Sequence, residues 1–326
     1  MKAIVYEGFG SPDILRYQDI DKSVPGDKEV LIKVRAASVN PLDWKLMKGG
    51  PFPVRALLGI GKPKIRRPGV DVAGEVEAIG TNVTDFKPGD EVFGTCVGAF
   101  AEYATSTSVF GMKSALALKP PNVTFEQAAS APIAALTALQ GLRDKGRIQT
   151  GQRVLINGAS GGVGTFAVQM ARVFGANITA VCSSANADMI RSLGADQVID
   201  YTQTDFTKTG DRYDLFLDCI GNRSLSASRR VLNPNGTLVM VGAPATIGLP
   251  GRLLGAFLWS LCGTRNMVFF IARMNQQDLV TIGEWMAAGK ITPVIDRRYR
   301  LREAREAFQY MEQGHARGKV VILVEV

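Results

Sequence analysis

The sequence contains few of the side chains that bind transition metals. Its 326 residues include one histidine, His315, and four cysteines at positions 96, 182, 219 and 262. The cysteines are far apart, and no two of them form a CxxC pair. A catalytic zinc generally takes three protein ligands drawn from Cys, His, Asp and Glu. We therefore expect no metal site, and we interpret the cysteines as reduced and buried.

Long hydrophobic runs are also absent. A membrane-spanning helix needs about 18 or more apolar residues in succession, and the best candidate, residues 253–262, is much shorter. The N-terminal sequence MKAIVYEGFG has neither the basic segment nor the apolar run of a secretory signal. We expect no integral membrane segment and a cytoplasmic location.

The charge is biased toward basic residues, with 38 Lys and Arg against 30 Asp and Glu. A net charge of +8 could attract phosphate-bearing ligands, nucleic acid or an anionic membrane surface. Basic residues gather at 62–67 and at 297–305, without the series of aromatic side chains on which bases stack. We interpret both clusters as solvated faces and expect no nucleic-acid partner. Binding of nucleic acid, or of a membrane surface through residues 253–270, stays open as an alternative.

Two domains are expected from the length and from a change of pattern along the chain. Short β-rich runs, split by Gly and Pro, fill the first hundred residues, which predicts a mainly antiparallel domain. These runs are residues 3–6, 29–39, 71–80, 91–94 and 100–104. After Pro120 and Pro121, helical patterns alternate with short apolar strands, which indicates a parallel sheet built from βαβ units. The predicted strands are residues 154–157, 178–182, 197–200, 215–218 and 237–241.

The end of the chain completes both domains. We expect a sixth strand at 267–271 and a helix at 276–288, closed by Gly289. Residues 319–326 are expected to form a strand that rejoins the first domain. The predicted fold class is α/β, with a doubly wound parallel sheet at 121–295 and a mainly antiparallel β domain at 1–120 that residues 296–326 complete. The strand at 267–271 could pair with its counterpart in a homodimer, and a monomer is the alternative.

A glycine-rich turn joins the first parallel strand to a helix. The sequence VLINGASGGVG at 154–164 runs directly into a helical pattern at 165–174. In a dinucleotide-binding turn, glycines let the backbone approach a pyrophosphate, whose charge the helix N-terminus stabilises. Gly161 and Gly164 fill the second and third glycine positions, while Ala159 replaces the first. The alternative is a turn whose glycines serve close helix packing alone.

The second parallel strand bears on which coenzyme the chain binds. It ends at Cys182, followed by Ser183 and Ser184, where NAD-selective proteins usually carry an acid that binds the ribose 2′-hydroxyl. An acid would repel a 2′-phosphate, whereas serine hydroxyls can donate hydrogen bonds to it. We therefore expect NADP(H) as the cofactor. Arg191 is the nearest basic residue that follows, and the alternative is that it faces solvent.

Several segments together resemble the medium-chain dehydrogenase/reductase superfamily, in its zinc-independent quinone oxidoreductase branch. They are AASVNPLDWK at 36–45, PGVDVAGEVEAIG at 68–80, FKPGDEVFG at 86–94, ALTAL at 135–139 and the glycine-rich turn. The resemblance implies a GroES-like catalytic domain and a Rossmann cofactor domain. Zinc-dependent relatives carry a Cys ligand near the position of Asn40 and a His-Glu pair at the positions of Val70 and Asp71, so the resemblance also implies that no zinc is bound.

The Asp-Trp-Lys sequence at 43–45 is most similar to plant enone oxidoreductases and chloroplast-envelope quinone oxidoreductase homologues. By this resemblance the cofactor is contacted by Asn40, Lys45, Thr137, Gly161, Gly162, Val163, Gly164, Ser183, Ser184, Asn186, Tyr201, Val241, Gly242, His315 and Ala316. One departure weakens the expected NADP selectivity, because several NADP-specific relatives carry a basic residue at the position of Asn186. For His315 the alternative is a surface loop.

The expected reaction is hydride transfer from NADPH to an α,β-unsaturated carbonyl compound (an enone) or to a quinone. An enolate oxygen then develops negative charge that a hydrogen-bond donor or a cation must stabilise. We predict that Lys45 has this catalytic role and that Asp43 holds Lys45 or backbone amides in place. The alternatives are that Asp43 caps a helix beginning near Trp44 and that Lys45 faces solvent. An alcohol dehydrogenase is a further alternative.

Overall fold

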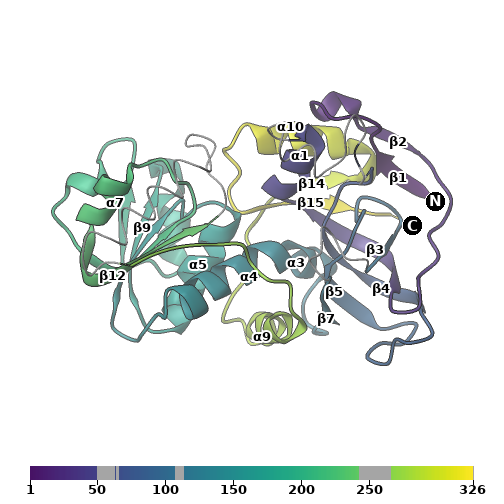
Figure 1. The fold of residues 1–326 in the computed structure, drawn as a ribbon, viewed down its shortest axis with the longest axis horizontal. Helices are drawn as coiled ribbons and strands as arrows, with labels where there is room; N and C mark the ends of the chain where they lie inside the picture. The colour runs from purple at the N-terminus through teal and green to yellow at the C-terminus, as the bar shows by residue number, and fades with distance from the viewer. Residues whose placement is uncertain (50–62, 64–65, 107–113, 242–265, 326) are drawn as a thin grey trace. The chain divides into compact units, whose positions relative to one another are not determined.

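The chain folds into two compact units. The computed structural model describes residues 1–49, 63, 66–106, 114–241 and 266–325. The first unit comprises Met1–Leu136 and Arg273–Val326, and the second comprises Thr137–Ala272. Figure 1 shows both units along the colour gradient of the chain.

A seven-stranded sheet forms the centre of the first unit. Its order is β14-β15-β3-β4-β5-β7, and β6 pairs with β3 beside this path. These strands are β3 (Val30–Val39), β4 (Asp71–Ile79), β5 (Glu91–Thr95), β6 (Tyr103–Thr105), β7 (Leu116–Leu118), β14 (Ile295–Arg300) and β15 (Lys319–Leu323). All pairs are antiparallel except β14 with β15. The predicted mainly antiparallel domain is confirmed, and the C-terminal strand rejoins it by pairing with β3.

Smaller elements cover this sheet. β1 (Lys2–Val5) and β2 (Arg16–Asp19) form a separate antiparallel pair, and α1 (Pro41–Lys48) follows β3. The helix α10 (Ala304–Glu312) lies against β14 and β15, as Figure 1 shows. Its Phe308 is fully buried and meets Phe100 edge to face, with ring centroids 5.7 Å apart. A continuous core therefore links the C-terminal elements to the N-terminal sheet.

The boundaries between the units differ from the expected ones at 120/121 and 295/296. The chain passes to the second unit after Leu136 and returns after Ala272. The helix α3 (Phe125–Ser130) packs on β3, β4 and β5, and α9 (Gln276–Ala287) packs on β7. Both helices lie within the residues assigned from the sequence to the parallel domain. Their buried faces give them to the antiparallel unit instead.

The second unit is built on a six-stranded parallel sheet in the order β10-β9-β8-β11-β12-β13. The strands are β8 (Arg153–Asn157), β9 (Asn177–Cys182), β10 (Gln197–Asp200), β11 (Tyr213–Asp218), β12 (Leu232–Val241) and β13 (Asn266–Phe270). Three helices connect successive strands: α5 (Gly162–Val173), α6 (Ala187–Ser192) and α7 (Leu225–Arg230). The helix α4 (Pro132–Gln140) leads into the unit. This order is the Rossmann order, so the predicted doubly wound sheet is confirmed.

The strand order reverses at β8, because β9 follows on one side of it and β11 lies on the other. In open parallel sheets, ligands bind beyond the carboxyl ends of the strands at this reversal. A ligand site is therefore expected among the residues that follow β8, β9 and β11.

Among the described residues, no helix combines the length and the apolar character needed to cross a bilayer. The apolar run at 253–262 lies outside the described residues.

Candidate functional site

Two buried charges lie side by side in the first unit. Asp71 begins β4 and Lys319 begins β15, and both of these strands pair with β3. The Lys319 Nζ is 3.3 Å from the Asp71 Oδ2, and the two side chains are 3% and 0% exposed. Burying a charge is costly unless it is paired and hydrogen-bonded. The surroundings of this pair must therefore satisfy both groups.

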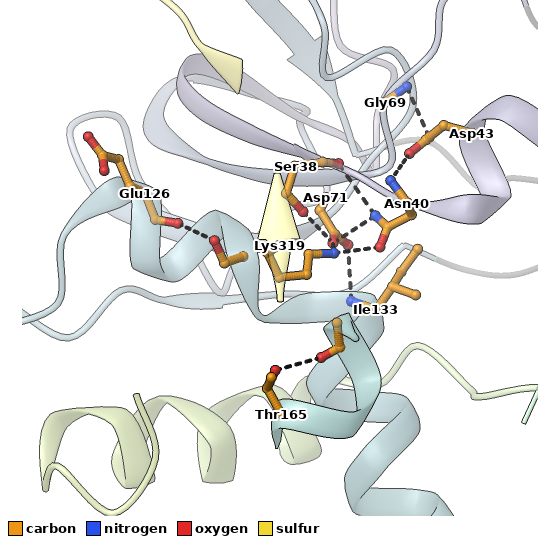
Figure 2. Close-up of polar contacts among 11 residues, drawn as sticks. Ser38, Asn40, Asp43, Gly69, Asp71, Glu126, Ile133, Thr165 and Lys319 are labelled. Atoms are coloured by element: carbon orange, nitrogen blue, oxygen red, sulfur yellow. Dashed lines mark hydrogen bonds and ion pairs between the residues drawn. The ribbon is translucent and has the colours of Figure 1, made fainter. Parts of the chain in front are cut away.

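The carboxylate of Asp71 accepts hydrogen bonds from four groups, as Figure 2 shows. Its Oδ2 receives the Ser38 hydroxyl at 2.9 Å, the Asn40 Nδ2 at 2.8 Å and the Lys319 ammonium. Its Oδ1 receives the backbone N–H of Ile133 at 3.0 Å. A buried carboxylate with this number of donors is fully satisfied, so Asp71 ties β3, β4, β15 and the start of α4 together.

Asn40 is the N-cap of α1 and uses both ends of its amide within this cluster. Its Oδ1 accepts from the Lys319 Nζ at 2.6 Å, while its Nδ2 donates to Asp71. Asn40 is one of the predicted cofactor contacts. With its amide engaged in this way, any contact of Asn40 with a cofactor falls to its backbone or carbon atoms.

Asp43 is buried in the first turn of α1 and holds two backbone amides. Its Oδ2 accepts from the Asn40 N–H at 2.8 Å, and its Oδ1 accepts from the Gly69 N–H at 3.2 Å. The alternative that Asp43 caps a helix beginning near Trp44 is correct in part: Asp43 accepts from the N–H of the N-cap Asn40, but α1 begins at Pro41 and Asp43 lies in its third position. The early start follows from proline, which favours the first helical position. Asp43 thus fixes the turn that precedes Lys45.

Burial raises the pKa of Asp43 to about 7, and the nearby charge of Asp71 adds to this rise. The two backbone amides and Lys319 act in the opposite direction without cancelling the effect. Lys45, two residues further along α1, is exposed, with its Nζ 5.9 Å from the Trp44 ring centroid. Its catalytic role stays a prediction.

We predict that Lys319→Met lowers the free energy of unfolding by about 3–5 kcal/mol, because it leaves the charge of Asp71 buried without its partner. Chemical denaturation measures this change. The control is Lys48→Met, which removes an exposed ion pair with Glu312 at 2.8 Å and should cost at most about 1 kcal/mol. The double variant Asp71→Asn/Lys319→Met should recover part of the loss. Equal costs for Lys319→Met and Lys48→Met would contradict the prediction.

We also predict that Asp43 makes the unfolding free energy depend on pH. The folded state keeps a proton on Asp43 up to about pH 7, whereas the unfolded chain releases it near its ordinary pKa of 3.8. Stability contributed by this proton is therefore lost as the pH rises through this window, by roughly 1 kcal/mol per pH unit. Urea unfolding of Asp43→Asn should show a flatter pH profile than the wild type. The exposed control Asp85→Asn should keep the wild-type slope, and a wild-type slope in Asp43→Asn would refute the assignment.

In the second unit, the glycine-rich turn joins β8 to α5. A Cβ added at Gly164 would lie 2.2 Å from the Gly158 carbonyl oxygen and 2.6 Å from the Ala159 Cα, so only glycine fits there. Gly161 is different, since its φ is −82° and an added Cβ would meet only the Gly158 oxygen, at an ordinary 3.5 Å. Helix packing therefore explains Gly164 but not Gly161. Close approach of a ligand to the protein backbone at Gly161 would explain why this position has no side chain.

The N-terminus of α5 is suited to a phosphate group. Gly161 is its N-cap and provides no side-chain acceptor for the amides of the first turn, which include those of Gly162 and Val163. Helix amides at these positions have no acceptor within the helix, and the helix dipole favours an anion near them. The residues present therefore fit the pyrophosphate of a dinucleotide.

Two polar residues missed by the sequence reasoning shape the loop beside this turn. Asn157 ends β8 and donates from its Nδ2 to the Asp218 Oδ1, at the end of β11, over 2.9 Å. The same oxygen accepts from the backbone amides of Ile220 and Gly221 at 3.1 and 2.9 Å. The sequence signal that could have found them is a polar residue at the end of each of two neighbouring apolar strands. Asn157 and Asp218 together fix the loop after β11, where the strand order reverses.

Four predicted contacts gather at the carboxyl ends of β9 and β10. Ser183 and Ser184 directly follow β9, and the Asn186 Nδ2 donates to the Ser183 Oγ at 3.1 Å. Tyr201, which follows β10, is 50% exposed. Ser184 and Tyr201 are exposed, and Ser183 and Asn186 are half-buried, at the edge where the Rossmann fold binds an adenosine ribose.

The other predicted contacts are distributed over both units. Thr137 is buried on α4, and Val241 ends β12 at the same edge as the turn. His315 is exposed and Ala316 is half-buried in the segment before β15. Gly242 lies outside the described residues.

Comparisons with known proteins agree with this architecture. Residues 26–140 match the family described as alcohol dehydrogenase GroES-like domain, and residues 193–322 match the family described as zinc-binding dehydrogenase. The chloroplastic quinone-oxidoreductase QR1 of Triphysaria versicolor is 35% identical over 99% of this chain and 98% of its own. The chain belongs to the medium-chain dehydrogenase/reductases. Within that superfamily it is an oxidoreductase of the quinone and enone oxidoreductase group.

Further relatives of this medium-chain dehydrogenase/reductase extend the similarity. The trans-enoyl reductase pgmF of Aspergillus terreus is 36% identical over 92% of this chain and 87% of its own. The solved quinone oxidoreductase from Coxiella burnetii is 31% identical, covers 100% of this chain and 99% of its own, and superimposes with a TM-score of 0.87. The similarity therefore spans both units.

The name of the second matching family implies zinc, but the described residues do not fit a zinc site. No three His, Cys, Asp or Glu side chains are grouped as metal ligands in this part of the chain. The oxygens of Asn40 and Asp71 that could face a cation instead face the ammonium of Lys319, at 2.6 and 3.3 Å. A second cation between these two residues would be repelled by Lys319.

Proposed function

We propose that this medium-chain dehydrogenase/reductase uses NADPH to reduce an α,β-unsaturated carbonyl compound or a quinone. The observation that carries the proposal is Gly161, whose missing side chain serves no contact within the described fold. The names of the relatives, a quinone oxidoreductase and a trans-enoyl reductase, support the acceptor class. An activated double bond or quinone accepts hydride without the strong polarisation that a metal supplies.

The chain's own residues would bind and orient the coenzyme, which supplies the hydride when bound. The amides at the start of α5 would hold the pyrophosphate, and Ser183, Ser184 and Tyr201 would surround the adenosine ribose. Donors aimed at the developing oxyanion generally provide the largest part of such catalysis. We propose Lys45 for this role, on the resemblance of residues 43–45, while Asp43 positions the turn before it.

The two glycines of the turn provide a matched test. Gly161→Ala should lower the free energy of unfolding by only about 1 kcal/mol, the usual cost of alanine at an N-cap. Its affinity for NADPH should fall by about tenfold or more, because the new methyl group lies where the pyrophosphate approaches. Gly164→Ala should cost about 3 kcal/mol or more in stability, since its Cβ meets backbone atoms. Calorimetric titration and chemical unfolding separate the effects, and wild-type affinity in Gly161→Ala would exclude this binding mode.

The reaction itself is tested by NADPH oxidation against a panel of enones, acrylates, quinones and aldehydes. We expect oxidation with conjugated carbonyl compounds or quinones, little with simple aldehydes, and the same rates after treatment with a chelator. Failure with every acceptor would disprove the proposed activity. Oxidation of simple alcohols that a chelator abolishes would favour the alternative of a zinc-dependent alcohol dehydrogenase.

Binding of nucleic acid or of a membrane surface is less well supported. In the arginine cluster, Arg298 pairs with Glu126 at 2.6 Å and Arg300 with Glu325 at 3.7 Å. Arg305 donates to two backbone carbonyls of the first unit. Much of the positive charge of the arginine cluster is thus engaged in ion pairs and hydrogen bonds within the protein. The lack of a nucleic-acid partner and the cytoplasmic location stay predictions, which RNA titration at several salt concentrations and cell fractionation would test.

We also propose a homodimer that forms through β13. This strand is the last in the order of the described sheet, and Phe269 and Ile271 near its end are 44% and 73% exposed. An exposed apolar edge strand is a template for pairing with another chain. Sedimentation of the wild-type protein distinguishes the dimer from a monomer.

A further inference from the structure

A carboxylate lies beside the proposed adenosine site, although none occurs in the segment that usually carries it. Asp200 is the last residue of β10, and it pairs in register with Cys182, the last residue of β9. Neighbouring strands are about 4.8 Å apart, so Asp200 lies next to the segment of Ser183 and Ser184. Ser184 is close enough to act on the pKa of Asp200.

The two oxygens of Asp200 have different surroundings. The Oδ1 accepts from the backbone N–H and the hydroxyl of Thr202, at 2.9 and 2.8 Å. The Oδ2 is buried and has no hydrogen-bond partner among the residues that the structure describes. Buried polar atoms without a partner are rare in folded proteins, and each calls for an explanation. A donor on a bound ligand would supply one.

The charge of Asp200 is not neutralised locally. Hydrogen bonds from Thr202, together with the effect of the nearby Ser184, lower the pKa of Asp200, so it is ionised at neutral pH. No ion pair joins Asp200 to a basic side chain within the described ranges. Arg191, the basic residue considered above for the 2′-phosphate, pairs instead with Asp188 at 2.8 Å. A phosphate placed beside Asp200 would meet an unscreened negative charge.

We propose that Asp200 is a specificity-determining residue that favours a free ribose 2′-hydroxyl over a 2′-phosphate. This inference rests on the proposed function, since it assumes that a nicotinamide coenzyme binds at the turn. The Oδ2 accepts a hydrogen bond from the 2′-hydroxyl of NAD(H), whereas the same oxygen repels the 2′-phosphate of NADP(H). Asp200 thus opposes the preference for NADP(H) that Ser183 and Ser184 create, and the wild-type chain also binds NAD(H).

The test compares the affinities of NADP⁺ and NAD⁺, which differ only in the 2′-phosphate, by calorimetric titration of the full-length protein. Asp200→Asn keeps an acceptor for Thr202 but removes the charge. It should lower the ratio of the NADP⁺ dissociation constant to the NAD⁺ dissociation constant by about tenfold. Asp200→Ala, which lacks any polar group, should lower the ratio in the same direction, so the test does not depend on one variant.

The control is Asp196→Asn, which removes one negative charge at the opposite end of β10. Asp196 accepts from the Ile178 N–H at 2.7 Å, and this variant should keep the wild-type ratio. An unchanged ratio in both Asp200 variants, with both nucleotides still binding, would overturn the role of Asp200 and leave the proposed function intact. Binding of neither nucleotide to the wild type would overturn the proposed function and the inference with it.

Discussion

The buried pair of Lys319 and Asp71 is the constraint on which the first unit depends. Removing two charges from water is costly, and their attraction repays this cost only when other polar groups complete the environment. Here Ser38, Asn40 and the amide of Ile133 provide that environment. Because these groups come from separate elements, the hydrogen bonds of the cluster form only when β3, β4, β15 and the start of α4 lie together. The cluster therefore links these elements, whatever net stability it contributes.

The same cluster determines what the residues around it can do. Asn40 cannot offer its amide to a ligand while it joins Lys319 to Asp71. The ammonium of Lys319 is likewise engaged, so it is not available to a substrate oxygen. The ammonium of Lys319 already lies between Asn40 and Asp71, the two residues whose oxygens could face a metal. An enone or a quinone, which accepts hydride without a Lewis acid, suits such a unit better than a simple alcohol or aldehyde does.

The elements that the sequence predicts best are those whose burial is visible in the residue pattern. The parallel strands β8, β9 and β11 are short apolar runs, and they were expected within one or two residues of their ends. β14 was missed because its sequence, IDRRYR, is polar and largely faces solvent. The helix α9 was expected, but the assignment of α3 and α9 to a unit depends on packing partners distant in sequence. No local pattern contains that information.

The candidate site was predictable where one segment carries the chemistry, as in the turn at 158–164. Even there, the sequence could not tell that Gly164 is required for packing while Gly161 is not, because the distinction depends on backbone atoms that approach in space. Lys319 resembled an ordinary lysine at the start of a strand, where a long side chain usually reaches water. Its burial depends on Asp71, which lies 248 residues earlier.

Asp200 shows most clearly why a linear rule for coenzyme selectivity is incomplete. The rule inspects the end of the second parallel strand, and Ser183 and Ser184 there suggest a 2′-phosphate. The sheet, however, places the end of β10 beside the end of β9, so a residue from the next strand faces the same ribose position. Selectivity depends on the sum of charges and donors around that position, not on which strand carries them. The hydroxyls of Ser183 and Ser184 favour NADP(H), and the ionised carboxylate of Asp200 favours NAD(H). The net preference for either coenzyme is therefore weaker than one segment alone suggests.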